Sequence, residues 1–197
     1  MRFIFLVAIV CSLSCPGHNW TARPSFTSPA EECDAAREFP QMLKIPGFGE
    51  AYQVVKSCDD FNRRKTSIAL KVFLDEWRKQ FGDSHRARRA VDKIMIMWER
   101  SPTPEYRSGY SMDGIYFNRA KVRGIAVSKS VVSIFYDNET TPRICQTALA
   151  HELVHSILWN RWGHGDPDHL GKRYPGWTKK HNVVIQNTNE VLCNLGI

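Results

Sequence analysis

The chain has 197 residues, of which 43% are hydrophobic, and 27 Lys and Arg residues against 20 Asp and Glu residues give it a formal net charge of +7. This length suits one domain with a hydrophobic core, and beyond residue 15 no segment is apolar over the length that a membrane-spanning helix needs. The basic clusters Arg63–Lys65 and His85–Arg89 are not interleaved with aromatic residues, so they predict a solvated basic face and no specific nucleic-acid partner.

Residues 1–15 have the pattern of a secretory signal peptide. The basic Arg2 precedes an unbroken apolar run from Phe3 to Val10, and small residues then surround Cys11 to Cys15. We therefore expect the protein to be secreted or to reside in the cell envelope. Cys15 follows a sequence close to a bacterial lipobox, which leaves lipidation at Cys15 and simple cleavage both open. A lipid at Cys15 is the only membrane attachment that we expect.

The next segment, residues 16–48, carries five prolines among serines, threonines and glycines, which is typical of a linker. Residues 49–197 are then predicted to form the folded, functional domain. Four cysteines remain after Cys15, and in an oxidising compartment they predict two disulfides. We favour the pairs Cys33–Cys58 and Cys145–Cys193 over the other connectivities and over free buried thiols.

The first half of the domain shows a mixture of elements. Residues 66–81 alternate like a strand in their first half and fit a helix in their second, so both elements stay open. Asp83 and Ser84 can cap a short helix that runs to about Val91. Strand-like segments follow at Lys93–Trp98, Gly114–Phe117, Gly124–Val127 and Val131–Tyr136. A polar turn joins the last two segments, which are expected to form a hairpin.

A long helix is predicted after the last strand. Thr141 followed by Pro142 is a good helix start, and the chain from there to Trp162 is free of glycine and further proline. Gly163 is suited to end the helix. Several strands followed by a long helix favour an α+β domain.

This helix carries the sequence His151-Glu152-Leu153-Val154-His155. Residues four apart lie on the same face of a helix, so the two histidines present their imidazoles to one point, as a tetrahedral zinc ion requires of two ligands. Glu152 is predicted to be the catalytic general base and acid, since it can take the proton of a zinc-bound water. Residues 147–157 carry no charge except Glu152, so the helix is expected to be buried, where ligation offsets the cost of burying the histidines. We expect one Zn²⁺ per chain.

The segment resembles the active-site helix of the zincin metalloproteases. That resemblance implies the two histidines as zinc ligands, the glutamate as the catalytic residue, and a zincin-like α+β fold. In such a fold a small mixed or antiparallel sheet packs on the long motif helix, and an edge strand, here Val131–Tyr136, holds an extended substrate. The metzincin subgroup is excluded, because its spacing requires glycine and histidine where this chain has Leu158 and Arg161.

The third zinc ligand is sought in the segment Gly163-His164-Gly165-Asp166-Pro167-Asp168-His169. His164 lies near the far end of the helix with little chain in which to return. His169 follows Gly163 by six residues, which at about 3.3 Å per residue can double back to the metal. The Gly-Asp-Pro-Asp-His string is also similar to motifs that follow H-E-x-x-H in exported bacterial zincin-like proteins. His169 is therefore preferred, and His164 and Glu190, the latter as in gluzincins, stay open as alternatives.

Four further residues are candidates for supporting roles. Asp166 and Asp168 can orient a ligand histidine, and capping of their own loop explains them equally well. His181 and Tyr174 can donate a hydrogen bond to a developing oxyanion, although a structural or surface role is favoured for both.

The sequence thus favours an exported zinc metallopeptidase that hydrolyses a peptide or protein substrate by Glu152-assisted attack of zinc-bound water. Two other functions stay open. A closed site made of His151, His155, His164 and His169 would only stabilise an envelope protein, but it leaves Glu152 without a role. A basic module would bind anionic polymers, and its binding would fall steeply with salt and survive chelation.

Overall fold

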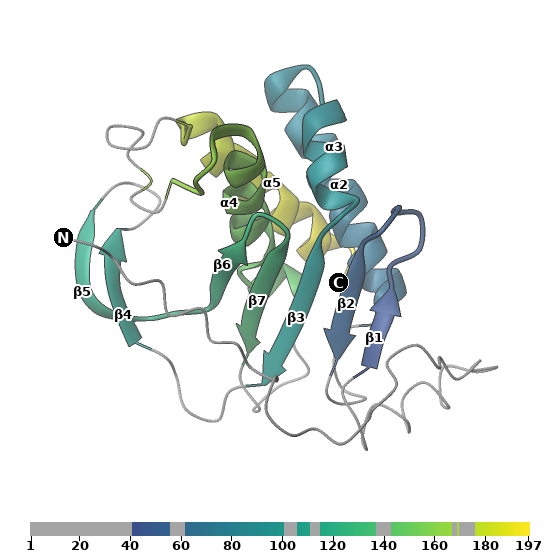
Figure 1. Cartoon of the computed structure of the whole chain (residues 1–197), viewed down its shortest axis with the longest axis horizontal. Coiled ribbons are helices and arrows are strands. Elements are labelled where there is room, and N and C mark those ends of the chain that lie inside the picture. The colour runs from purple at the N-terminus through teal and green to yellow at the C-terminus, as the bar shows by residue number, and fades with distance from the viewer. Residues whose placement is uncertain are drawn as a thin grey trace.

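A computed structural model of the chain (Figure 1) describes residues 41–55, 62–100, 106–110, 115–136, 143–166, 169 and 176–197. The predictions that fall outside these residues concern the signal peptide, Cys15, the Cys33–Cys58 pair, Asp168 and Tyr174. None of the helices in the described ranges is long and apolar enough to cross a membrane.

The described elements form a five-stranded sheet, a two-stranded ribbon and a set of helices. The strands of the sheet are β1 (Gln41–Lys44), β2 (Tyr52–Val55), β3 (Met95–Arg100), β6 (Gly124–Ser128) and β7 (Val131–Tyr136). The ribbon consists of β4 (Tyr106–Tyr110) and β5 (Tyr116–Lys121). The helices are α2 (Arg63–Phe81), α3 (His85–Val91), the 3-10 turn η1 (Ile144–Gln146), α4 (Leu149–Trp162) and α5 (Lys179–Asn194). The predicted α+β class is confirmed.

The sheet has the order β1-β2-β3-β7-β6 and mixes both strand directions. β2, β3 and β7 are parallel, whereas β1 and β6 run antiparallel to their neighbours. The predicted hairpin of residues 124–136 is confirmed as β6 and β7. The prediction that Val131–Tyr136 is the edge strand is wrong, because β3 pairs with β7 along its whole length, from Met95↔Val131 to Arg100↔Tyr136. Within the described residues, the edge beside the motif helix is β6.

The core lies between the sheet and the helices, which gather on one side of it (Figure 1). The strands turn alternate side chains into this layer, and Ile96, Trp98, Val132 and Ile134 are at most 1% exposed. β1 and the buried Ile45 that follows it belong to the same folded unit, so this unit includes the last part of the segment 16–48 predicted as a linker.

Helix α2 settles the ambiguous segment 66–81, which is helical throughout. Its buried side chains recur with the helical period on the face that packs against α5, and they include Thr66, Ala69, Leu70, Phe73, Leu74 and Trp77. Asn62 caps its start, since the Asn62 side-chain oxygen accepts a hydrogen bond from the N–H of Arg64 at 2.7 Å. Helix α3 ends at Val91 as predicted.

Helix α4 begins at Leu149 and not at Pro142 as predicted. The chain first forms the turn η1, in which Cys145 is held to the end of the chain by its N–H, which donates to the carbonyl of Ile197 at 3.1 Å. The N-cap residue of α4 is Ala148, and just before it the hydroxyl oxygen of Thr147 accepts a hydrogen bond from the N–H of Leu149 at 3.3 Å. Gly163 ends α4 in the left-handed conformation, with φ of 79°, as predicted.

The structure pairs Cys145 with Cys193, as predicted. Their Cα atoms are 5.2 Å apart and 48 residues separate them in the chain. The bond therefore links η1, just before the motif helix, to the last turn of α5.

Replacing both Cys145 and Cys193 by serine is expected to lower the free energy of unfolding by about 2–5 kcal/mol, because the unfolded chain then loses a long covalent loop. Urea denaturation of the variant and the native protein, each with and without reductant, measures the difference. A native protein that is equally stable in reductant would contradict the prediction.

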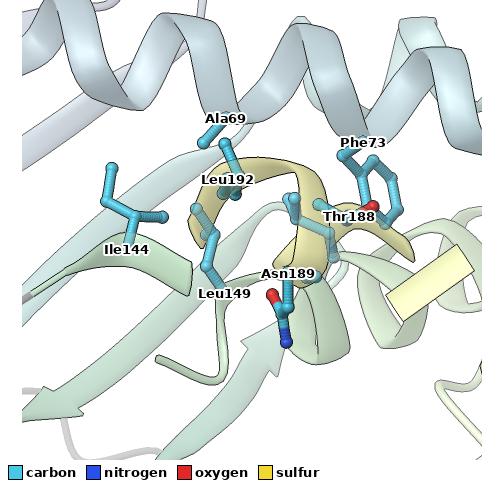
Figure 2. A pocket seen from close by; sticks show the side chains of 9 residues that line it. Ala69, Phe73, Ile144, Leu149, Thr188, Asn189 and Leu192 are labelled. Carbon is cyan, nitrogen blue, oxygen red and sulfur yellow. The ribbon is translucent and has the colours of Figure 1, made fainter. Parts of the chain in front are cut away.

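A small apolar pocket lies where α2, η1, α4 and α5 meet, and Figure 2 shows the side chains around it. The lining residues are Ala69, Phe73, Ile144, Leu149, Ala150, Leu153, Thr188, Asn189 and Leu192. The pocket leaves no room for a water molecule. It is a packing gap behind the motif helix and not a substrate site.

Candidate metal centre

His151, His155 and His169 bring three imidazole nitrogens together, and their candidate ligand atoms all lie within 4.8 Å of one another. Nε2 of His155 is 3.0 Å from Nε2 of His151 and 2.9 Å from Nε2 of His169. The first two histidines project from successive turns of α4, and the third reaches them from the segment beyond Gly163. In the described part of the chain this is the one group of His, Cys, Asp and Glu side chains close enough to hold a metal ion.

The backbone orients His155 toward the cluster. Its Nδ1 donates a hydrogen bond to the carbonyl of Gly165. Because a carbonyl only accepts, Nδ1 carries the ring proton and Nε2 keeps its lone pair free to bind a metal ion. Burial, followed by the neighbouring His169, lowers the pKa of His155 to about 3, while the bond to Gly165 acts in the opposite direction.

His151 is held neutral in the same way. Burial, and then the nearby His155 and His169, lower the pKa of His151 well below its usual value. His151 and His155 are therefore uncharged at neutral pH, which is the form of imidazole that ligates a metal.

Glu152 belongs to α4, and its side chain lies against the edge strand β6, with 4% of the residue exposed. Burial raises the pKa of this carboxyl to about 8, and a backbone hydrogen bond from Ala126 in β6 opposes the shift. A carboxyl group with a pKa near neutrality is suited to take and return protons.

The edge strand also approaches Glu152 closely at Gly124. A Cβ atom at residue 124 would lie 2.8 Å from Cγ of Glu152 and 2.9 Å from Cβ of Ala148. These distances are shorter than van der Waals contact, so only glycine fits here without a shift of the glutamate or the helix.

Gly124→Ala is therefore expected to displace Glu152, and we expect peptide hydrolysis to fall at least about 10-fold and unfolding free energy to fall by about 1–3 kcal/mol. Hydrolysis rate and zinc content of the purified variant test this. The matched control is Gly49→Ala, where the nearest atom to an added Cβ, in Asp92, is 3.8 Å away. Equal effects of the two substitutions would contradict the role of the close contact.

Trp177 is a residue of this site that sequence reasoning did not identify. Its ring centroid lies 4.5 Å from that of His169, 4.9 Å from that of His155 and 5.3 Å from that of His151. Its indole N–H donates to the side-chain oxygen of Asn182 at 2.8 Å, which anchors the ring to α5. A tryptophan just before a helix carries no local signal of this role, because the histidines that it contacts are distant in the sequence.

Asp166 contacts both Trp177 and His169. Its side chain is 0% exposed and accepts a hydrogen bond from the backbone N–H of Trp177 at 2.7 Å. Its carbonyl accepts the N–H of His169 at 3.1 Å, and Asp166 and His169 both have positive φ, of 51° and 52°. These contacts favour the loop-capping role for Asp166, which brings His169 back to the helix.

The other candidate residues lie outside the cluster. His164 accepts a hydrogen bond at Nδ1 from the N–H of Asp166 at 3.4 Å, and Glu190 is exposed on α5. His181 is buried in the first turn of α5, where its Nδ1 accepts the N–H of Thr178 at 2.9 Å. Burial lowers the pKa of His181 to about 4, and the nearby Arg161 adds to the shift while the Thr178 bond opposes it. These contacts give His181 a capping role.

The donor set suits a zinc ion. Zn–N bonds of about 2.0–2.1 Å in a tetrahedron place the ligand nitrogens about 3.3 Å apart. The observed separations of 2.9 and 3.0 Å are close to that value. Three protein ligands with a fourth position open is the arrangement of catalytic zinc sites.

The chain matches no protein-family model, no curated protein and no solved structure. Functional inference therefore starts from the chemistry of the site and not from the fold.

Proposed function

We propose that the protein is a zinc-dependent metallopeptidase with a zincin-like active site. The observation that carries the proposal is the convergence of three Nε2 atoms beside a buried glutamate on the same helix. A zinc site that only stabilises the fold needs a fourth ligand and gives Glu152 no role, whereas hydrolysis needs both an open position and a base.

A zinc ion held by these residues would supply a Lewis acid for the scissile carbonyl and a lowered pKa for the nucleophilic water. His151, His155 and His169 would be its ligands. Glu152 accepts a proton from the attacking water and passes it to the leaving amine nitrogen. In the metal-free protein, burial raises the pKa of this carboxyl.

The edge strand β6 supports binding of an extended substrate beside the base. Its Gly124 and Ala126 both approach Glu152. The turn after β6 is fixed to the motif helix, because the Lys129 carbonyl accepts hydrogen bonds from the Ser156 hydroxyl at 2.7 Å and the Asn160 side chain at 2.6 Å. A polypeptide that adds to this edge by main-chain hydrogen bonds would pass close to the carboxyl group.

Export is part of the proposal. The signal-like pattern of residues 1–15 supports it, and the Cys145–Cys193 bond suits an oxidising compartment. Cleavage after the signal and lipidation at Cys15 both remain compatible with it.

The test is to measure zinc by elemental analysis and then to incubate the protein with an unbiased peptide mixture, analysed by mass spectrometry. We expect one zinc per chain and cleavage products that disappear with a chelator and return when zinc is added. A protein that binds no zinc after reconstitution would refute the proposal. Bound zinc without any cleavage would favour a non-catalytic zinc protein.

A further inference from the structure

Among the described residues, the exposed charges on the stretch that carries the candidate site are basic. From residue 115 to residue 189, the described part of the chain contains two carboxylates, and both are buried, with Glu152 4% exposed and Asp166 0% exposed. The charged side chains that are exposed over the same stretch are all basic, namely Arg119, Lys121, Arg123, Lys129, Arg143, Arg161, Lys179 and Lys180. Residues 75–92, by contrast, include exposed or partly exposed carboxylates, and two of these form the ion pairs Arg78–Asp75 and Arg88–Asp92. The charged side chains that this stretch exposes within the described residues are therefore basic, and it is the stretch that carries the three histidines.

Three of these basic residues lie in the part of the chain that connects the ribbon to Gly124. Arg119 and Lys121 belong to β5, and Arg123 lies two residues further along the chain. The carbonyl of Arg123 accepts the N–H of Phe135 at 3.0 Å, which fixes its backbone beside β7. The next residue is Gly124, which touches Glu152. The run of positive charge thus ends one residue away from the contact with the proposed base.

The same ribbon exposes large apolar side chains. Tyr106 is 51% exposed, Ile115 68% and Tyr116 59%, and the Arg119 guanidinium lies over the Tyr106 ring at 5.5 Å. In Figure 1 the ribbon lies beyond β6, at the end of the sheet away from β1. Exposed tyrosines next to cations form a surface that fits a ligand carrying both apolar groups and negative charge.

We propose that the substrate is an acidic polypeptide segment, extended along β6 and the ribbon, with carboxylates facing Arg119, Lys121 and Arg123 and apolar side chains against the exposed tyrosines. This inference rests on the proposed peptidase function and names its substrate class. A polypeptide is favoured over a nucleic acid because the edge strand offers main-chain hydrogen-bonding groups that an extended peptide can pair with. The field of the basic surface raises the rate of encounter with such a segment and depends on ionic strength.

The test uses the full chain with Glu152→Gln, loaded with zinc, so that peptides bind without being cleaved. Two fluorescent peptides of equal length and apolar content differ only in glutamate against glutamine. We expect the glutamate peptide to bind at least about 10-fold more tightly at 50 mM salt, and the difference to shrink strongly at 500 mM salt.

A charge-matched pair of variants locates the effect. Arg119→Gln, Lys121→Gln and Arg123→Gln together are expected to remove the preference for the acidic peptide. The control is Arg64→Gln, Arg86→Gln and Arg89→Gln, which removes the same charge from exposed residues of α2 and α3 and is expected to leave the preference unchanged. Equal losses in both variants, no preference in the parent protein, or stronger binding of a single-stranded DNA oligomer would overturn the inference.

Zinc content and hydrolysis by the native protein separate this inference from the proposed function. Hydrolysis without a preference for the acidic peptide refutes the inference alone. A preference for the acidic peptide in a protein that binds no zinc and cleaves nothing refutes the proposed function, and with it the assignment of the peptide as a substrate.

Discussion

Glu152→Gln is expected to reduce peptide hydrolysis by about 10²–10⁴-fold while the protein keeps one zinc per chain. The three imidazoles that form the candidate site are unchanged, so the metal is retained, and only the group that moves the proton is lost. Glutamine has nearly the same shape and can keep a hydrogen bond with the backbone of Ala126. Elemental analysis and a peptide cleavage assay on the same preparation measure both properties. Loss of zinc together with activity would mean that Glu152 supports the site structurally.

The same variant has a second readout in the metal-free protein. Burial raises the pKa of Glu152 from 4.5 to about 8, so between these pH values the folded state holds a proton that the unfolded state has lost. The stability that protonation contributes is complete below pH 4.5 and is lost as pH rises toward 8. Glutamine does not ionise, so the variant should become more stable relative to the native protein as pH rises, by roughly 2–4 kcal/mol at pH 8.

Urea denaturation in the presence of a chelator, at pH 5 and pH 8, measures this difference. The lowered pKa values of His151 and His155 affect the native protein and the variant alike, so their contributions cancel in the comparison. A stability difference that is the same at both pH values would show that Glu152 is not a carboxyl of raised pKa.

His169→Ala is expected to weaken zinc binding by more than about 100-fold, because it removes one of three ligands. Loss of a residue that only hydrogen-bonds a ligand typically weakens metal binding by about 10–100-fold. His151 and His155 remain on α4 and give a two-ligand site. The control is His164→Ala, which lies in the same segment but outside the cluster and should keep its zinc. Titration with a competing chelator gives both affinities.

The outcome for His164 also decides between two kinds of site. If His164→Ala and His169→Ala both remove the metal, a closed site of four histidines is present and the protein is better described as a non-catalytic zinc protein. If neither removes it, the third ligand lies elsewhere.

The sequence predicted those parts of the fold whose causes are local. The hairpin of β6 and β7, the end of α3 and the glycine at the end of α4 depend on residues close together in the chain, and all three predictions are confirmed. The helical period of α2 was also present in its sequence, but it becomes clear only when Thr66 and Ala69 are counted among the buried residues.

The parts that were missed depend on distant contacts. β7 is an inner strand because β3 pairs with it. The sequence of β7 alone does not show which strand pairs with it. The late start of α4 follows from the attachment of Cys145 to Cys193 and to Ile197 at the other end of the chain. For the site, the spacing of His151 and His155 and the number of residues from Gly163 to His169 anticipated the cluster, whereas Trp177 was identified only from its ring contacts with the histidines.

The two hydrogen bonds that join the Lys129 carbonyl to Ser156 and Asn160 couple the edge strand to the motif helix. Gly124 and Ala126 approach Glu152 from the same strand, so β6 and α4 are joined at more than one point. These contacts fix the position of Glu152 relative to the edge strand. The opposite side of the site is held by separate contacts, in which Asp166 accepts the N–H of Trp177 and the ring of Trp177 lies against His169.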